Sequence, residues 1–311
     1  MATATPHEFL IPEQVLRTAL GLIRDDLFIA ATFNRDYESD FGGGKGASVN
    51  VRIPAVLKAR RRTLAEAGTP IVVDKLKEST VAVKMTHMIY SAVDLTDEQM
   101  TFSIEDFTRQ VTAPQLVAMV EDIENFCVET MQALPESVGI AYDPAAPELT
   151  FTRARKTLRD LGLPADGLWA ACGTGVYANL VDAKAISDAS QSGSTEALRN
   201  AGVGKVRGFN TVESNRLDDD EIVFYGRDAF TLAIRAPKVP AGAAKGESRS
   251  ENGFAMRWVQ DYDSNILADR SIFSTFIGAQ ALKYPRLDKN DPDGFTEIVP
   301  ALRVKTGTPV A

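Results

Sequence analysis

Residues 112–134, TAPQLVAMVEDIENFCVETMQAL, contain the strongest secondary-structure signal in the chain. Their apolar side chains recur at the spacing of one face of an α-helix. Pro114 stands near the start, where the missing N–H of a proline costs a helix least. At about 1.5 Å per residue such a helix spans roughly 30 Å, the diameter of a small domain. We therefore predict a long helix as the spine of the fold, with an apolar face made of Leu116, Met119, Val120, Ile123, Cys127, Met131 and Leu134.

The opposite face of this helix is predicted to carry four carboxylates, those of Glu121, Asp122, Glu124 and Glu129. They belong to an acidic stretch, since residues 93–136 contain ten carboxylates and one base, a local charge of −9. Residues 50–90 have the reverse balance, with eight bases against three acids, a local charge of +5. Segments of opposite sign within one chain favour contact between the basic segment of one copy and the acidic segment of another.

Two segments upstream of the helix alternate between apolar and polar residues at the period of a β-strand. The first comprises Val49, Val51 and Ile53, and the second comprises Val81, Val83 and Met85. We predict that they form a long hairpin with a basic tip, made of Lys58, Arg60, Arg61 and Arg62. This tip has few apolar residues to bury, so the arm would gain more by lying on a neighbouring molecule than on its own domain.

The remaining segments predict a mixed α+β chain. Helical patterns are expected at residues 12–27, 151–161 and 177–186, the second of them ended by Gly162 and Pro164. Strand-like patterns are expected at residues 168–172, 206–212, 222–234, 254–258 and 295–305. Loops are expected at residues 191–204 and 236–252, the latter of low complexity.

Composition excludes several classes of protein. The 311 residues are 44% hydrophobic and 24% charged, and no apolar run reaches the roughly 18 residues of a transmembrane helix. A net charge of −8 disfavours wholesale binding to nucleic acid. Residues 1–11 contain no Lys or Arg, so a secretory signal is not expected. Cys127 and Cys172 are too few for a disulfide framework, and we expect both to be reduced and buried.

Residues 173–178, GTGVYA, fit the dinucleotide-binding pattern G-x-G-x-x-A, which follows a strand and opens a helix. A true fingerprint needs a second parallel strand that ends in an acidic residue about twenty positions later. Residues 191–195 read instead as a polar loop, so we interpret Gly173 and Gly175 as parts of a tight turn. A nicotinamide-dependent enzyme that uses Gly173 to Ala178 remains the alternative from another functional class.

Other candidate sites are weaker. The glycine-rich segment 42–46 has no Ser or Thr after Lys45, so we interpret it as a hinge and not as a phosphate loop. Residues 288–294 and 218–221 are interpreted as turns and not as cation sites. With only His7 and His87, a multi-histidine metal site is not possible. The common hydrolase, zinc and redox motifs are absent from the sequence, and we predict no catalytic residue, cofactor or metal.

The order and spacing of these segments resemble the coat proteins of tailed bacteriophages with the Hong Kong 97-like fold, particularly those of actinobacterial phages. The resemblance covers about residues 8–310. The residues that carry it are segment 36–53 with VNVRIP at 49–54, LTDE at 95–98, the helix from Pro114, and the segments 158–164, 202–204, 208–209 and 214–215.

The resemblance implies a division of the chain into functional parts. It places an N-terminal arm and helix at residues 1–33, an extended loop with flanking strands at 34–93, and a peripheral domain with the spine helix at 94–149. An axial domain follows at 150–235, then a surface loop at 236–252 and return strands that complete the peripheral domain at 253–311. The extended loop would reach over an adjacent subunit.

The implied function is that of a non-catalytic major capsid protein, which self-assembles through pentamers and hexamers into an icosahedral shell around double-stranded DNA. Expected subunit-interface residues are Lys58, Arg60, Arg61, Arg62, Glu121, Asp122, Glu124 and Glu129. Further implied partners are scaffolding, portal and decoration proteins, with no membrane. The implied location is the virion, after synthesis in the host cytoplasm. A compartment shell of the encapsulin type, with enzyme cargo in place of DNA, is the alternative within the same fold.

Overall fold

The computed structural model describes residues 28–35, 48–53, 55–61, 63, 68, 70–71, 73, 76, 78–102, 107–183, 204–251, 254–264, 267–287 and 295–306. The chain divides into two compact units. Unit 1 comprises residues 1–47, 84–133 and 232–279, and unit 2 comprises residues 48–83, 134–231 and 280–311. The helix expected at 12–27, the hinge at 42–46, the turn at 288–294 and all but Gly204 of the loop at 191–204 lie outside the described residues.

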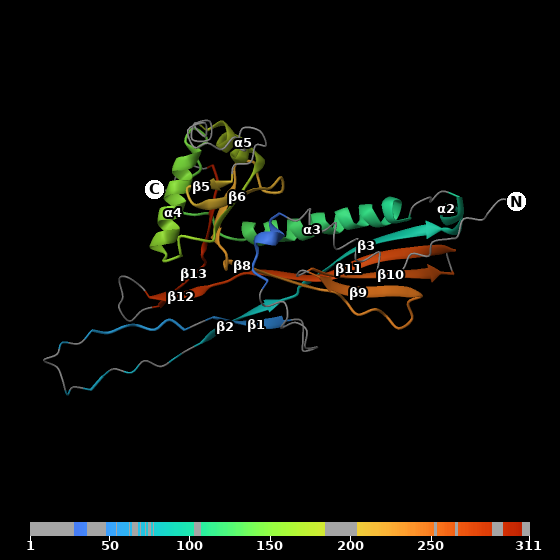
Figure 1. Ribbon diagram of the computed structural model, residues 1–311, viewed down its shortest axis with the longest axis horizontal. Helices are drawn as coiled ribbons and strands as arrows, with labels where there is room; N and C mark the ends of the chain where they lie inside the picture. Colours follow the sequence, from blue (N-terminus) through green and yellow to red (C-terminus); the bar gives the residue numbers. More distant parts are fainter. Residues whose placement is uncertain are drawn as a thin grey trace. The chain divides into compact units, whose positions relative to one another are not determined.

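Unit 1 contains an antiparallel sheet with the strand order β3–β11–β10–β9 (Figure 1). A further strand, β8 (Phe230–Arg235), also pairs with β11. The bounds are His87–Thr96 for β3, Ala268–Ala281 for β11, Phe254–Asp263 for β10 and Lys245–Glu251 for β9.

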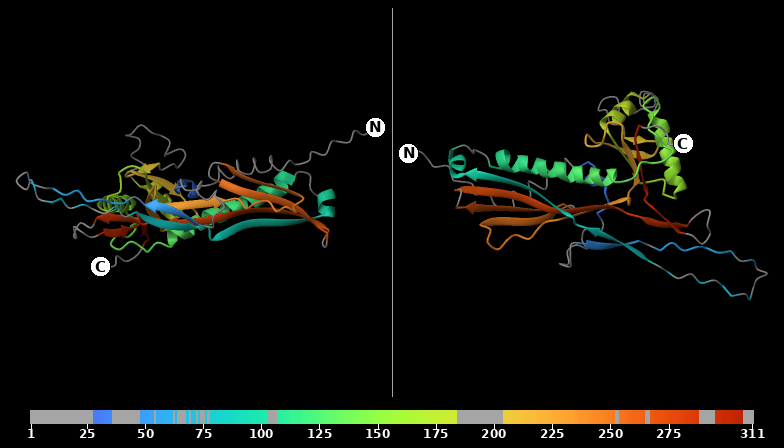
Figure 2. Two further views of the ribbon diagram at one scale, coloured as in Figure 1. Left: turned by 90° about the horizontal axis from the view of Figure 1, so that it is seen from below. Right: turned by 180° about the vertical axis from the view of Figure 1, so that it is seen from behind.

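The helix α3 (Ala113–Gln132) runs along this sheet (Figure 2) and confirms the predicted spine. It is preceded by α2 (Asp97–Phe102) and by a π-helical turn, η4 (Thr108–Thr112). Its apolar stripe is buried from Leu116 to Met131. Alternate residues of the strands are buried as well, among them the cross-strand pair Trp258 and Phe273. Each large apolar side chain removed from water contributes about 1.5–3 kcal/mol to folding.

Unit 2 is built on a sheet with the order β14–β7–β4–β6–β5, in which only the β4–β6 pair is parallel. The bounds are Ala301–Val304 for β14, Ile222–Gly226 for β7, Leu168–Cys172 for β4, Phe209–Glu213 for β6 and Lys205–Val206 for β5. Its core contains a cluster of three aromatic rings with centroids 4.9–5.9 Å apart, those of Phe151, Phe209 and Phe224.

Two helices belong to unit 2, α4 (Pro147–Asp160) and α5 (Thr174–Asp182). The first begins four residues before the predicted helix, with proline at its first position. It ends at Asp160, shortly before Gly162, whose φ of +88° is the left-handed conformation that favours glycine. The N–H of Leu163 then donates to the carbonyl of Leu158 at 3.1 Å, which closes the helix.

Two ribbons complete the described chain. The predicted hairpin is present as β1 (Ser48–Ile53) paired with β2 (Ser79–Lys84), and residues 55–61 between them are neither helix nor strand. The second ribbon pairs β12 (Tyr284–Leu287) with β13 (Phe295–Ile298). Among all the residues that the structure describes, no helix is long and apolar enough to cross a membrane.

Two expectations are wrong. Residues 236–252 are not a loop throughout, because Lys245–Glu251 is the strand β9, paired with β10 along its whole length. The C-terminal strand β14 also does not complete the sheet that carries β10 and β11. It pairs with β7 and forms one edge of the unit 2 sheet.

Candidate functional site

The hairpin arm, which comprises β1, β2 and the residues between them, carries basic side chains together with exposed apolar side chains. Lys58 is half-buried, Arg60 and Arg61 are exposed, and Arg62 lies outside the described residues. The described turn of the arm is at Gly68, so Lys58, Arg60 and Arg61 lie on its first limb and not at its tip. Large apolar side chains with exposed fractions of 55–78% also lie on the arm, namely those of Leu57, Ile71, Val73 and Leu76. Exposed apolar groups in one segment indicate a surface that contacts another macromolecule.

Three of the four predicted acidic residues of α3 lie where the sequence placed them. Glu121, Asp122 and Glu129 are exposed. Glu124 is 2% exposed, so its assignment to the solvent-exposed face and to a subunit interface is a correction. The spacing gave the necessary signal, because Glu124 follows Val120 by four residues and precedes Cys127 by three, on the apolar face.

The Glu124 carboxylate joins the segment that begins at Phe28 to α3 through hydrogen bonds. Its two oxygens accept hydrogen bonds from the backbone N–H groups of Phe28, Ile29 and Ala30, each at 3.0 Å. These groups open the 3₁₀ turn η1 (Ala30–Thr32), where unpaired N–H groups and the partial positive charge of a helix N-terminus favour an anion. Burial, and secondarily the charge of Glu124, raises the pKa of the nearby Cys127 thiol.

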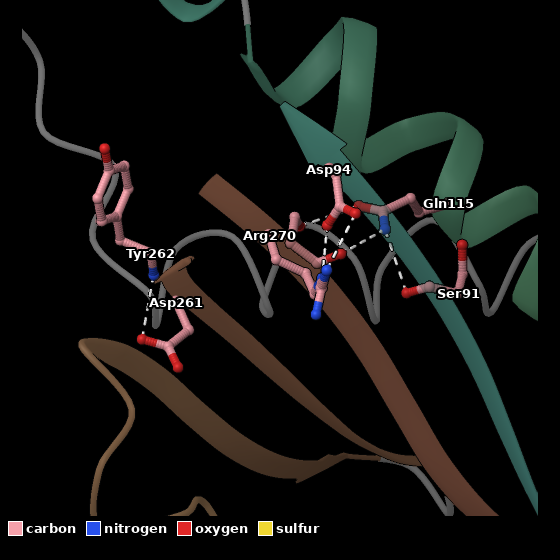
Figure 3. A network of polar contacts seen from close by, with 7 residues as sticks. Ser91, Asp94, Gln115, Asp261, Tyr262 and Arg270 are labelled. Atoms are coloured by element: carbon pink, nitrogen blue, oxygen red, sulfur yellow. Dashed lines mark hydrogen bonds and ion pairs between the residues drawn. The ribbon is translucent and has the colours of Figure 1, made fainter. Parts of the chain in front are cut away.

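A buried polar network joins the first turn of α3 to the sheet of unit 1 (Figure 3). The Gln115 amide nitrogen donates to the carbonyls of Ser91 at 3.2 Å and Ser271 at 3.0 Å. The Ser271 hydroxyl donates to the Gln115 carbonyl oxygen at 3.0 Å and accepts from the Trp258 indole at 2.9 Å. Sequence reasoning missed this network, because a single glutamine beside an apolar stripe does not reveal its partners.

An exposed ion pair lies on the same two strands, between Asp94 of β3 and Arg270 of β11 (Figure 3). The hydrogen bond from Arg270 lowers the pKa of the Asp94 carboxyl. Because solvent screens exposed ion pairs, this pair is a minor part of the fold's stability.

The space beside the two glycines of the GTGVYA segment, Gly173 and Gly175, is occupied by the chain's own backbone. A Cβ on Gly173 would lie 1.9 Å from the carbonyl oxygen of Asp218, and one on Gly175 would lie 2.9 Å from that of Asp219. The N–H of Val176 donates to the Asp219 carbonyl at 2.9 Å, where a pyrophosphate would otherwise bind. The strand β4 does pair in parallel with a later strand, β6, but this strand ends at Glu213, 35 positions after Ala178 and not about twenty, and residues 191–195 lie outside the described residues. The glycines nevertheless permit a tight turn.

Two carboxylates of the acidic turn at residues 218–221, those of Asp218 and Glu221, form ion pairs. Asp218 pairs with Lys305, whose hydrogen bond lowers the pKa of the Asp218 carboxyl. Glu221 is fully buried and pairs with Arg303, which also donates to the carbonyl of Leu134 at 3.3 Å. These ion pairs hold the end of the chain around β14 against the turn, which supports the interpretation of the turn as structural.

The remaining polar candidates do not assemble into a metal site. His87 lies with its ring centroid 5.2 Å from that of Phe126, and its Nδ1 is 2.8 Å from the Thr86 hydroxyl. Cys127 and Cys172 are free and buried. Among the described residues, no group of three or more His, Cys, Asp or Glu side chains could hold a metal ion.

Comparison with known proteins identifies the fold. Neither the protein-family models nor the curated protein sequences give a match. A structure of Mycobacterium phage Che8 is similar with a TM-score of 0.63 and 17% identity, covering 89% of this chain and 90% of that one. The capsid structure of the cyanophage P-SCSP1u gives 0.56 and 14%, with 84% of each chain covered. A virus-like particle from Pyrococcus furiosus gives 0.51 and 10%, covering 94% and 98%. The chain therefore has the Hong Kong 97-like fold of tailed-phage capsids that the sequence indicated.

Proposed function

We propose that this chain is the major capsid protein of a tailed bacteriophage, a structural and non-catalytic subunit of an icosahedral shell around double-stranded DNA. The observation that carries the proposal is the likeness to phage structures over nearly the whole chain, at a TM-score of 0.63 with 89% and 90% coverage. A fold alone does not imply a function, so the proposal needs support from surfaces suited to self-assembly.

The hairpin arm and α3 supply such surfaces. We propose that Lys58, Arg60, Arg61 and Arg62 of one subunit contact Glu121, Asp122 and Glu129 of a neighbour. The exposed apolar side chains of the arm support this, since they would leave water in the same contact. Charge pairs add orientation and discrimination, which a purely apolar contact lacks.

Weak contacts suffice for a shell, because each is repeated in every subunit. Association must first overcome the loss of translational and rotational freedom, about 4–15 kcal/mol, so that only part of the contact energy remains as affinity. Pentamers and hexamers with modest contacts can dissociate and correct errors before the closed shell fixes them. Under this proposal the protein is made in the host cytoplasm and ends in the virion, with scaffolding, portal and decoration proteins as further partners.

The alternative within the fold is a compartment shell that encloses protein cargo. The likeness to a virus-like particle from Pyrococcus furiosus, which covers 94% of this chain, supports self-assembly of copies into a particle. Its TM-score of 0.51 is below the 0.63 of the phage structure, and this order supports the phage assignment.

Electron microscopy of the purified protein, with size-exclusion chromatography, tests the proposal. We expect closed icosahedral particles or rings of five and six subunits. Nuclease-protected DNA within particles from phage-producing cells supports the capsid, whereas enzyme cargo without DNA would identify a compartment. A uniform monomer that stays unassembled with its scaffolding protein, and that binds a nicotinamide cofactor, would contradict both.

A further inference from the structure

The strand β9 has one edge without a strand partner. It pairs with β10 on one side, and within the described residues no strand lies on the other side. The preceding loop contacts this part of the sheet through side chains. Its Pro237 carbonyl accepts from the Ser248 hydroxyl at 3.0 Å, and its Lys238 carbonyl accepts from Arg257 at 2.9 Å. No backbone hydrogen bond joins β9 to that loop in the described part of the chain. An open strand edge is a template for pairing with another strand.

The sequence of β9, KGESRSE, is self-complementary in charge. Its charged residues alternate with Gly246, Ser248 and Ser250, so they lie on one face of the sheet. In an antiparallel pair centred on Ser248, Glu247 of each copy faces Arg249 of the other. Lys245 then stands opposite position 251, a glutamate in the sequence.

The same charges disfavour the two registers whose centre is shifted by one residue. Moving the centre of the pair to Glu247 places two glutamates opposite each other and Lys245 opposite Arg249. Moving it to Arg249 places two arginines opposite each other. Opposite charges in directly facing positions stabilise a strand pair, and like charges destabilise it. Charged residues on the edge strand of a sheet usually prevent any pairing with another chain. The charges of β9 instead disfavour two of these three registers and favour the one centred on Ser248.

We propose that β9 pairs with β9 of a second copy, antiparallel and centred on Ser248, across a two-fold axis. The contact is isologous, with the same surface on both partners, and joins the two unit 1 sheets into one. It rests on the proposed function only in requiring that copies associate, and it adds a two-fold contact to the arm contact described above.

A cysteine at the centre of the pair tests the register. Directly opposed residues in antiparallel strands have Cα atoms about 4.5–5.5 Å apart, within the usual disulfide range of about 4.4–6.8 Å. Ser248→Cys should therefore give a reducible dimer on mild oxidation. Ser250→Cys is the matched control, because it faces Gly246, and two copies of residue 250 would be about 14 Å apart at ~3.4 Å per residue.

The native cysteines should not contribute, because Cys127 and Cys172 are buried and burial raises the pKa of both thiols. We expect at least tenfold more dimer for S248C than for S250C in the same oligomeric fraction. Within the S248C background, Glu247→Arg should reduce the dimer severalfold, and the double change Glu247→Arg with Arg249→Glu should restore it.

The outcomes separate this inference from the proposed function. Particles that form but show no S248C dimer, or equal dimer at both positions, overturn the strand pairing and leave the shell standing. A specific S248C dimer without particles, even with scaffolding protein present, supports the pairing and argues against the shell. If neither the soluble nor the assembled protein gives the dimer, the inference is wrong.

Discussion

At the scale of single residues, the buried carboxylate of Glu124 joins parts of the chain that are far apart in sequence. Its three hydrogen bonds reach residues 28–30, nearly a hundred positions away. A buried carboxylate is stable only when its lone pairs are satisfied, and backbone N–H groups at the start of a helical turn satisfy them well. Glu124 thereby fixes the position of residues 28–30 against α3.

Removing this carboxylate should destabilise the fold. Glu124→Ala leaves three backbone N–H groups without their acceptor, and we expect a loss of about 2–4 kcal/mol in the free energy of unfolding. Glu124→Gln should lose less, because its amide oxygen can still accept from some of them. Urea denaturation of the soluble subunit measures the change.

The matched control is Glu121→Gln on the exposed side of the same helix, expected to change stability by no more than about 0.5 kcal/mol. Equal stability of the Glu124→Ala and Glu121→Gln variants would show that the buried carboxylate does not fasten the segment.

At the scale of elements, the periodicity of apolar residues predicted those helices and strands that have a buried apolar face. The helix α3 and the strand β4 have apolar side chains at the spacing of their buried faces, so the sequence located both to within a few residues. The strand β9 has no apolar residue at all, because it is an edge strand, and its pattern therefore resembled a loop. The partner of β14 was also unpredictable, since pairing with β7 depends on distant residues and not on local propensity.

The interface residues illustrate the same limit. The exposed positions Glu121, Asp122 and Glu129 follow from helical spacing, whereas the prediction for Glu124 is wrong, because the same spacing puts this residue on the buried apolar face. Its acceptor role could not be predicted, because the donors lie in the segment from Phe28 to Ala30, whose position against α3 is set by the tertiary fold.

The Gln115 network should fix the register of α3 on its sheet. Replacing Gln115 with Leu keeps the volume but leaves the carbonyls of Ser91 and Ser271 without a donor, so we expect a loss of about 1–3 kcal/mol. Ser271→Ala should cost a similar amount. Because the two residues share hydrogen bonds, the double variant should lose less than the sum of the single losses.

Thermal unfolding of the two single variants and the double variant measures this coupling, with Val117→Ala on the exposed face of α3 as the control. Strictly additive losses would mean that Gln115 and Ser271 act independently and that the network does not set the register.

At the scale of the whole molecule, the charges of the chain are segregated, with +5 over residues 50–90 and −9 over residues 93–136. In an isolated subunit such segregation has no necessary role, because exposed pairs add little stability. Between copies it favours the correct orientation and suppresses contacts of like charge. Salt should weaken such contacts, since exposed charges are screened beyond about 8 Å at physiological ionic strength.

Reversing the basic charges of the arm should therefore block assembly while leaving the subunit folded. In the variant Arg60→Glu, Arg61→Glu, Arg62→Glu, the arm would face the acidic residues of a neighbour with like charge. We expect unchanged circular dichroism and thermal unfolding, because Arg60 and Arg61 are exposed, but no particles by electron microscopy. The triple change to Lys keeps the charge and should still assemble. Normal particles from the Glu variant would exclude the proposed contact between the arm and the acidic face of α3, and assembly would then depend on other surfaces, such as the exposed apolar side chains of the arm.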